Sequence, residues 1–144
     1  MTEVHNDRRK PDSAALWAIL VAVGTAAVYG ALFAWDQHRD LDPETMSESG
    51  PYEAWQVILA VLLLGLLAFV AGRRGRPWVA TIVLPVVFTL CFTIDAATDR
   101  NADGLWIIGA FLVAIGSLAG TAASAGLGLA LRNRALRGAA PQHP

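Results

Sequence analysis

Long uncharged stretches separated by short charged segments dominate this 144-residue chain. Four windows contain no Asp, Glu, Lys or Arg, and they are 22, 19, 18 and 28 residues long. The windows are 14–35, 54–72, 77–94 and 104–131. A helix needs roughly 17–25 mostly apolar residues to cross a hydrocarbon layer ~30 Å thick, so each window is long enough. Backbone groups inside lipid must be paired within their own segment, so we expect each window to be a helix.

The pattern predicts an all-α membrane protein with four transmembrane helices in an up-down bundle. The transmembrane domain is expected at 14–131, between a polar tail at 1–13 and a basic tail at 132–144. We expect both tails to be disordered, because they contain no apolar periodicity that could build a core. The predicted helices within the domain are 14–35, 54–72, 77–95 and 104–131.

The basic residues are distributed asymmetrically, which sets the orientation. If the chain crosses four times, both tails and the turn at 73–76 lie on one side, and that side holds 9 of the 11 Lys and Arg. Basic residues in short loops are retained in the cytoplasm, so both termini are predicted to be cytoplasmic. The arginines at the ends of the membrane helices could also bind anionic lipid headgroups. These topology-setting residues are Arg73, Arg74, Arg76, Arg132, Arg134 and Arg137.

Composition agrees with a membrane location. Hydrophobic residues make up 55% of the chain and charged residues 16%, whereas soluble domains carry about 25% charge. Arginine outnumbers lysine ten to one, which is typical of a GC-rich genome. We therefore expect a multi-pass protein of a cell membrane, the inner membrane of a bacterium.

Small residues recur at every fourth position on two of the predicted helices. Residues four apart share a helix face, and small side chains there let another backbone come close, which is how membrane helices associate. An alanine-rich composition can also produce such stripes by chance. The two predicted helix-packing faces are Ala18, Ala22, Ala26 and Gly30, and Gly116, Gly120, Ser124 and Gly128.

The third predicted helix carries Thr81, Pro85, Thr89 and Thr93 at the same spacing, with Asp95 at its outer end. In one interpretation these groups line a water-filled path. In the other, which we favour, the hydroxyls bond to carbonyls four residues earlier. A hydrated carboxylate at the interface is the simpler interpretation of the aspartate, and a buried functional group is the alternative.

Motifs for catalysis and metal binding are lacking. The three histidines lie outside the predicted spans, and the chain has no HExxH, CxxC or glycine-rich phosphate loop. A single cysteine, Cys91, excludes an intrachain disulfide, and we interpret it as an apolar packing residue. Segment 99–104 matches the first half of a calcium loop, but Ala110 stands where the bidentate Glu is needed. The loop at 36–44 could bind a divalent cation through carboxylates and one imidazole, but we interpret it as a solvated acidic loop. The residues concerned are Asp36, His38, Asp40, Asp42 and Glu44. No catalytic residue, metal site, cofactor or nucleic-acid partner is expected.

These observations favour a small non-enzymatic membrane protein that acts by helix packing, as an assembly or accessory subunit. Its expected partners are the lipid bilayer and either further copies of itself or another membrane protein. The first alternative is an oligomeric channel or small transporter with the threonine face and Asp95 along the path. A membrane enzyme is the second alternative.

Overall fold

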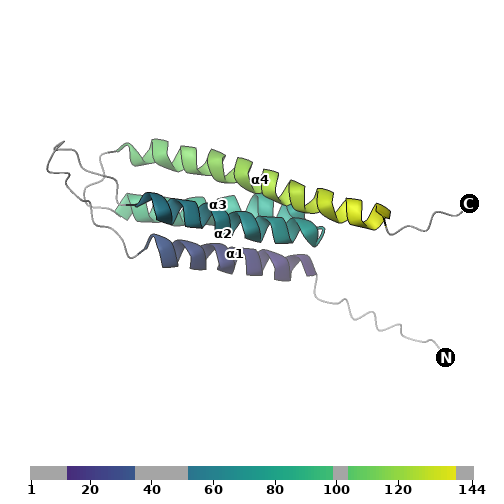
Figure 1. Ribbon diagram of the computed structural model, residues 1–144. Helices are drawn as coiled ribbons and strands as arrows, with labels where there is room; N and C mark the ends of the chain where they lie inside the picture. The colour runs from purple at the N-terminus through teal and green to yellow at the C-terminus, as the bar shows by residue number, and fades with distance from the viewer. Residues whose placement is uncertain (1–12, 35–51, 99–103, 139–144) are drawn as a thin grey trace, which may run out of the picture.

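The described parts of the chain are entirely helical. The computed structural model describes residues 13–34, 52–98 and 104–138, and Figure 1 shows their arrangement. The helices are α1 (Ser13–Leu32), α2 (Ala54–Arg73), α3 (Pro77–Thr98) and α4 (Trp106–Gly138). Each one is long and apolar enough to cross a membrane. The prediction of an all-helical chain with four candidate spans is therefore confirmed.

The fourth helix is longer than the sequence pattern indicated. It has 33 residues and continues to Gly138, past the predicted end at Leu131, so residues 132–138 of the predicted tail are helical. Arginine, alanine and leucine are good helix formers, and no proline or glycine interrupts 132–137. At ~1.5 Å per residue α4 spans ~50 Å, more than a bilayer core requires. Its last turns therefore extend past the other helices, as Figure 1 shows.

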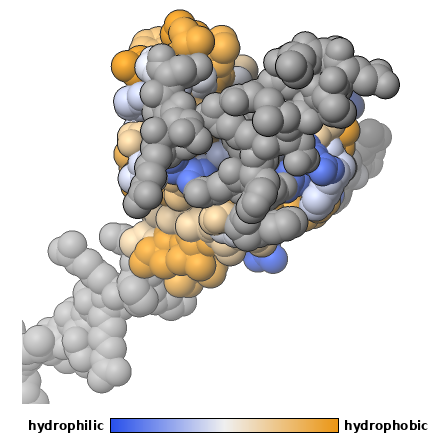
Figure 2. Space-filling view, turned by 90° about the vertical axis from the view of Figure 1, so that its left-hand side faces the viewer, coloured by the Kyte–Doolittle hydropathy of each residue, from blue (hydrophilic) through white to orange (hydrophobic). Residues whose placement is uncertain are grey.

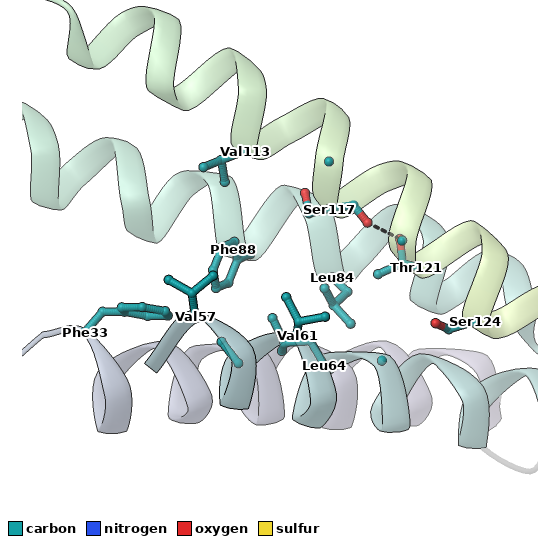
Figure 3. Close-up of a pocket in the computed structure, with 14 residues that line it drawn as sticks. Phe33, Val57, Val61, Leu64, Leu84, Phe88, Val113, Ser117, Thr121 and Ser124 are labelled. Carbon is teal, nitrogen blue, oxygen red and sulfur yellow. Dashed lines mark hydrogen bonds between the residues drawn. The ribbon is translucent and has the colours of Figure 1, made fainter. Parts of the chain in front are cut away.

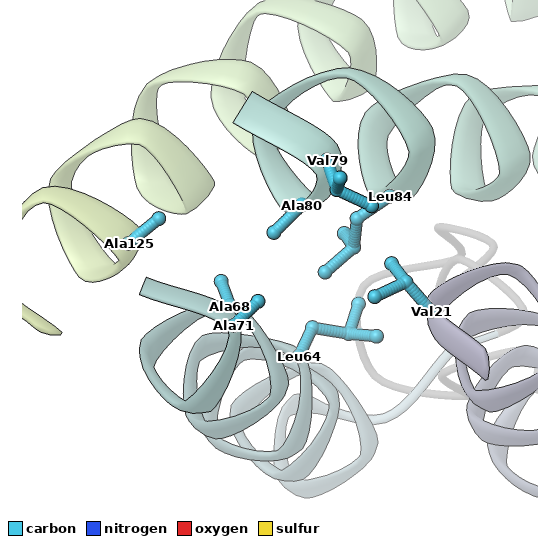
Figure 4. Packing of buried hydrophobic residues seen from close by; sticks show 8 residues of the cluster. All are labelled: Val21, Leu64, Ala68, Ala71, Val79, Ala80, Leu84 and Ala125. Carbon is cyan, nitrogen blue, oxygen red and sulfur yellow. The ribbon is translucent and has the colours of Figure 1, made fainter. Parts of the chain in front are cut away.

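The four helices form three layers. Helices α2 and α3 lie in the middle, and α1 and α4 cover opposite sides of this pair without contacting each other (Figure 1). All four contribute to one apolar core, shown in Figure 4. The core residues are Val21 of α1, Leu64, Ala68 and Ala71 of α2, Val79, Ala80 and Leu84 of α3, and Ala125 of α4.

Large apolar side chains also cover much of the outside. Ile58 and Leu62 of α2 and Phe111 and Leu112 of α4 are among those that are more than half exposed. Figure 2, viewed along the helices, shows hydrophobic side chains on the flanks of the molecule. Such a surface would be costly in water, and it suits a chain surrounded by lipid.

The turn between α2 and α3 is set by a glycine. Gly75 adopts φ +79°, a left-handed conformation that other residues adopt only with strain. Its N–H donates to the Gly72 carbonyl at 2.9 Å, and the Arg76 N–H donates to the Ala71 carbonyl at 3.0 Å. This pair of bonds is a Schellman motif, which ends α2, and Pro77 then starts α3 with the φ that a first helical turn needs. A three-residue turn suffices, so α2 and α3 run in opposite directions.

Two glycines allow the backbones of α2 and α4 to touch. A Cβ placed on Gly72 would overlap the carbonyl of Ala125, and one placed on Gly128 would overlap the carbonyl of Phe69. Both contacts lie near the Arg74–Arg76 turn, at what we call the arginine end of the molecule. The opposite end carries Asp95, and we call it the Asp95 end. The close α2–α4 contact is therefore confined to the arginine end.

Candidate functional site

A groove between α2 and α4 is a hollow whose walls come from several helices. It encloses about 360 Å³, within the range of ~300–1,000 Å³ that is usual for ligand pockets. Figure 3 shows side chains of α2 facing those of α4 across it, with α3 forming the floor. The facing walls include Val57, Val61 and Leu64 on α2 and Val113, Ser117 and Thr121 on α4.

The groove exists because α4 packs tightly against α2 at only one end. Gly72 and Gly128 bring the backbones together at the arginine end, whereas Gly116 and Gly120 lie in the wall of the groove. A Cβ on either of the latter two would meet no atom within 4 Å. Both are exposed. The predicted Gly-x-x-x-Gly pair is thus left unpacked by the rest of the described chain.

The other predicted packing residues divide between the inside and the outside. On α4, Ser124 is half-buried and Gly128 is buried against α2. On α1, Ala18 and Ala22 are half-buried, and Ala26 and Gly30 are exposed. The buried face of α1 lies one residue away, about 100° around the helix. Its buried positions are Val21, Thr25, Tyr29 and Leu32, and Phe33, directly after the helix, is buried as well.

Two of the three α4 hydroxyl groups that line the groove bond to their own helix. Ser117 Oγ donates to the Ala114 carbonyl at 3.2 Å, and Thr121 Oγ1 donates to the Ser117 carbonyl at 2.7 Å. With these two donors used, the α4 wall presents mainly small and apolar groups, together with the hydroxyl of Ser124. Such a surface favours close packing of an apolar segment rather than acid–base or nucleophilic chemistry.

A second cluster gathers around Asp95 at the opposite end. The phenol groups of Tyr29 and Tyr52 both donate to Asp95 Oδ2, at 2.9 and 2.7 Å. These three residues belong to α1, to the segment that enters α2, and to α3, so the carboxylate links three parts of the fold. Phe33 packs its ring 4.9 Å from that of Tyr52, and Phe88 lies edge-on 5.5 Å from Tyr29. The carboxylate is therefore a half-buried, hydrogen-bonded group at the edge of an aromatic cluster.

Neither tyrosine was singled out by the sequence, although the chain contains only two. Gln56 was also missed, and it is fully buried in the first turn of α2. Its Oε1 accepts a hydrogen bond from the Glu53 N–H at 2.7 Å and so satisfies a free donor at the start of the helix. In the sequence, an acidic residue followed three positions later by glutamine could have indicated where α2 begins.

The threonine stripe of α3 does not behave as one unit. Thr81 Oγ1 donates to the Pro77 carbonyl at 3.0 Å, as the structural interpretation expected. Pro85 is buried, and Thr93 is half-buried. Thr89 Oγ1 is buried and has no hydrogen-bond partner among the described residues. It lies beside two further hollows between α3 and α4, which are lined mainly by apolar side chains.

Replacing Thr89 by valine is expected to stabilise the protein. Valine has nearly the same shape and removes a buried hydroxyl that costs about 1–3 kcal/mol when it is unsatisfied. Thr81→Val removes a formed bond and is the matched control, with an expected loss of about 0.5–1.5 kcal/mol. Unfolding in mixed detergent micelles measures both changes. A loss of stability in Thr89→Val would show that water or another group satisfies this hydroxyl in the membrane.

The described arginines all lie at the arginine end, and they differ in their surroundings. The Arg74 guanidinium lies 5.8 Å above the ring of Trp17. That of Arg132 packs against the turn at Gly75. Arg134 and Arg137 are exposed on the last turns of α4. The remaining two arginines of this end are Arg73 and Arg76.

The acidic segments weighed as ion sites, 36–44 and 99–103, lie outside the described residues. Within the described ranges no group of three or more His, Cys, Asp or Glu side chains could hold a metal ion. Four apolar helices with a lipid-like outer surface place the chain in the class of multi-pass helical membrane proteins. Comparisons with protein-family models, curated proteins and solved structures found no match for this chain.

Proposed function

We propose that this chain is a non-catalytic assembly or accessory subunit that docks a transmembrane helix of another membrane protein in the α2–α4 groove. The helices cross the membrane in up-down order, and both termini are cytoplasmic. This orientation is supported by the positions of the basic residues, 9 of 11 of which fall in the tails and the 73–76 turn. A cell membrane, the bacterial inner membrane, is the proposed location.

The observation that carries the proposal is the exposed, uncontacted pair Gly116 and Gly120 in the wall of the groove. Lipid is as apolar as leucine, so the hydrophobic effect does not drive membrane helices together. They associate where small residues let backbones approach and make many dispersion contacts. This chain already uses small residues in that way at Gly72 and Gly128. The second pair offers the same surface on the outside of the subunit.

The absence of a reactive group in the groove agrees with a binding role. The hydroxyls of Ser117 and Thr121 bond to their own helix, and the remaining lining side chains are almost all apolar. Among the described residues, the only carboxylates are those of Glu53 and Asp95. Neither lines the groove.

Replacing both Gly116 and Gly120 by leucine is expected to abolish assembly without unfolding the subunit. Open space surrounds both positions, so the larger side chains fit the isolated chain but fill the groove. Gly126→Leu is the matched control, since Gly126 also lies in open space on α4 and is not part of the groove lining. The measurement is the size of the complex extracted from native membranes in a mild detergent, with the stoichiometry of any second protein.

The double leucine variant should shift the complex to the size of the free subunit, and Gly126→Leu should leave it unchanged. An unchanged complex in the double variant would refute the docking role of this groove. If Gly126→Leu also reduced the complex to the size of the free subunit, added bulk anywhere on α4 would disturb assembly, which also contradicts the proposal.

A further inference from the structure

The groove face of α4 continues into its basic extension. An α-helix completes five turns in 18 residues, so Gly116 and Arg134 lie on the same line along α4. Gly120 is about 40° away on this face, and Arg137 is about 60° from Arg134 on the other side. All four residues are exposed. A helix that packs on the two glycines therefore passes close to Arg134 where it leaves the apolar layer, and Arg137 lies on the flank of this face.

The two arginines are not engaged by the described part of the chain. Arg74 and Arg132, in contrast, pack against Trp17 and the Gly75 turn. Glu53 and Asp95 are the acidic residues of the described ranges, and both lie at the opposite end. Within the described ranges, no acidic side chain therefore pairs with Arg134 or Arg137, and their charges are available to a partner. Arg134 lies ~27 Å and Arg137 ~32 Å along the axis from Gly116, at ~1.5 Å per residue.

We propose that the helix in the groove belongs to a different protein and carries an acidic segment directly after its transmembrane stretch, on the arginine side. This inference rests on the proposed docking function and specifies its partner. A second copy of this chain is disfavoured as the occupant, because in the same orientation it would bring its own arginines to this end. Like charges at close range repel and discriminate against such a pairing.

The charge pair selects the partner, and the glycine pair provides the contact. Exposed ion pairs contribute little each and weaken with salt, but two of them together change affinity severalfold at low ionic strength. The partner's small residues must therefore face Gly116 and Gly120, with Asp or Glu ~27 Å further along its axis.

Synthetic transmembrane peptides test this assignment with the full-length chain. The peptides share one Leu/Ala core with a Gly-x-x-x-Gly pair and differ only in a Glu-rich, Lys-rich or Gln-rich flank. The chain is reconstituted in phosphatidylcholine vesicles at low salt, and binding is followed by energy transfer between labelled peptide and chain. We expect the Glu-rich peptide to bind about tenfold more tightly than the Lys-rich one, and high salt to remove the difference.

Charge reversal with Arg134→Glu and Arg137→Glu should reverse the order of the two peptides. If it does not, while Gly116→Leu with Gly120→Leu still abolishes binding, the acidic partner is refuted and the docking function stands. If the leucine pair leaves all peptide binding unchanged, the docking function itself fails. Self-association of the chain that requires the two glycines would overturn the inference in favour of a second copy. A loss of the Glu preference when phosphatidylglycerol is added would assign the arginines to lipid headgroups and would equally overturn it.

Discussion

Replacing Gly72 by alanine is expected to destabilise the protein by about 1–3 kcal/mol, the usual cost of forcing an extra methyl group into a filled site. The new Cβ would overlap the carbonyl of Ala125, and a backbone atom cannot move aside as a flexible side chain can. Helices α2 and α4 must separate instead, and they would lose the contacts around Ala68 and Ala71. Titration with a denaturing detergent, followed by circular dichroism or tryptophan fluorescence, measures the change.

Gly126→Ala is the control for this substitution. A Cβ there meets nothing, so the loss of a helical glycine should leave stability unchanged or raise it by up to about 1 kcal/mol. Gly128→Ala should resemble Gly72→Ala, because its Cβ would overlap the Phe69 carbonyl. The two harmful substitutions act on neighbouring contacts of the same α2–α4 crossing, so their effects should not add fully. Equal stability of Gly72→Ala and Gly126→Ala would mean that α4 does not pack here as described.

The four spans could be predicted from the sequence because hydrophobic length is a local property. A window without charge has few alternatives in a membrane, whatever its neighbours do. The end of α4 could not be placed in the same way. Charge was taken to end the helix at Leu131, but charge ends the apolar layer and not the hydrogen-bonded backbone. The arginines that follow Leu131 are therefore expected to end the membrane-inserted part of α4, while the helix itself continues to Gly138.

The inward faces could not be predicted, because the usual signal is lost in lipid. A soluble helix shows its core by contrast with a polar outer face, whereas both faces of α1 are apolar. The small stripe through Ala26 and Gly30 was visible, but it lies about 100° from the face that includes Tyr29. In α4 every fourth residue from Gly116 to Gly128 is small, and only the crossing point with α2 decides that Gly128 is buried.

The Asp95 cluster could not be predicted from the sequence either, for a related reason. Its hydrogen bonds join residues 66 and 43 positions apart, from Tyr29 and Tyr52 to one carboxylate. The sequence indicated a polar group near the interface, and the order in which the helices pack decides which donors reach it. Tyr29 lies inside the apolar window 14–35 and Tyr52 just before the window 54–72, and for such aromatic rings a place at the membrane interface is the common interpretation.

Removing the Asp95 carboxylate is the second change with a large expected effect. Asp95→Ala deletes the acceptor of both phenol groups, and hydrogen bonds to a charged group contribute about 1.5–3 kcal/mol each. We expect a loss of stability of about 3 kcal/mol, because the two bonds share one oxygen and do not add fully. Asp95→Asn keeps an oxygen in place and should cost less than half as much. Detergent unfolding of both variants provides the comparison.

A double-mutant cycle between Tyr29→Phe and Asp95→Ala isolates their bond, since phenylalanine retains the ring contacts with Phe33 and Phe88. A coupling of about 1 kcal/mol or more is expected, with a similar value for Tyr52→Phe. The same variants separate a structural carboxylate from one on a conduction path. Asp95→Asn should leave the ion flux of reconstituted liposomes unchanged if the group only joins α1 to α3. No coupling together with altered flux would contradict the structural role and favour an oligomeric channel over the assembly function.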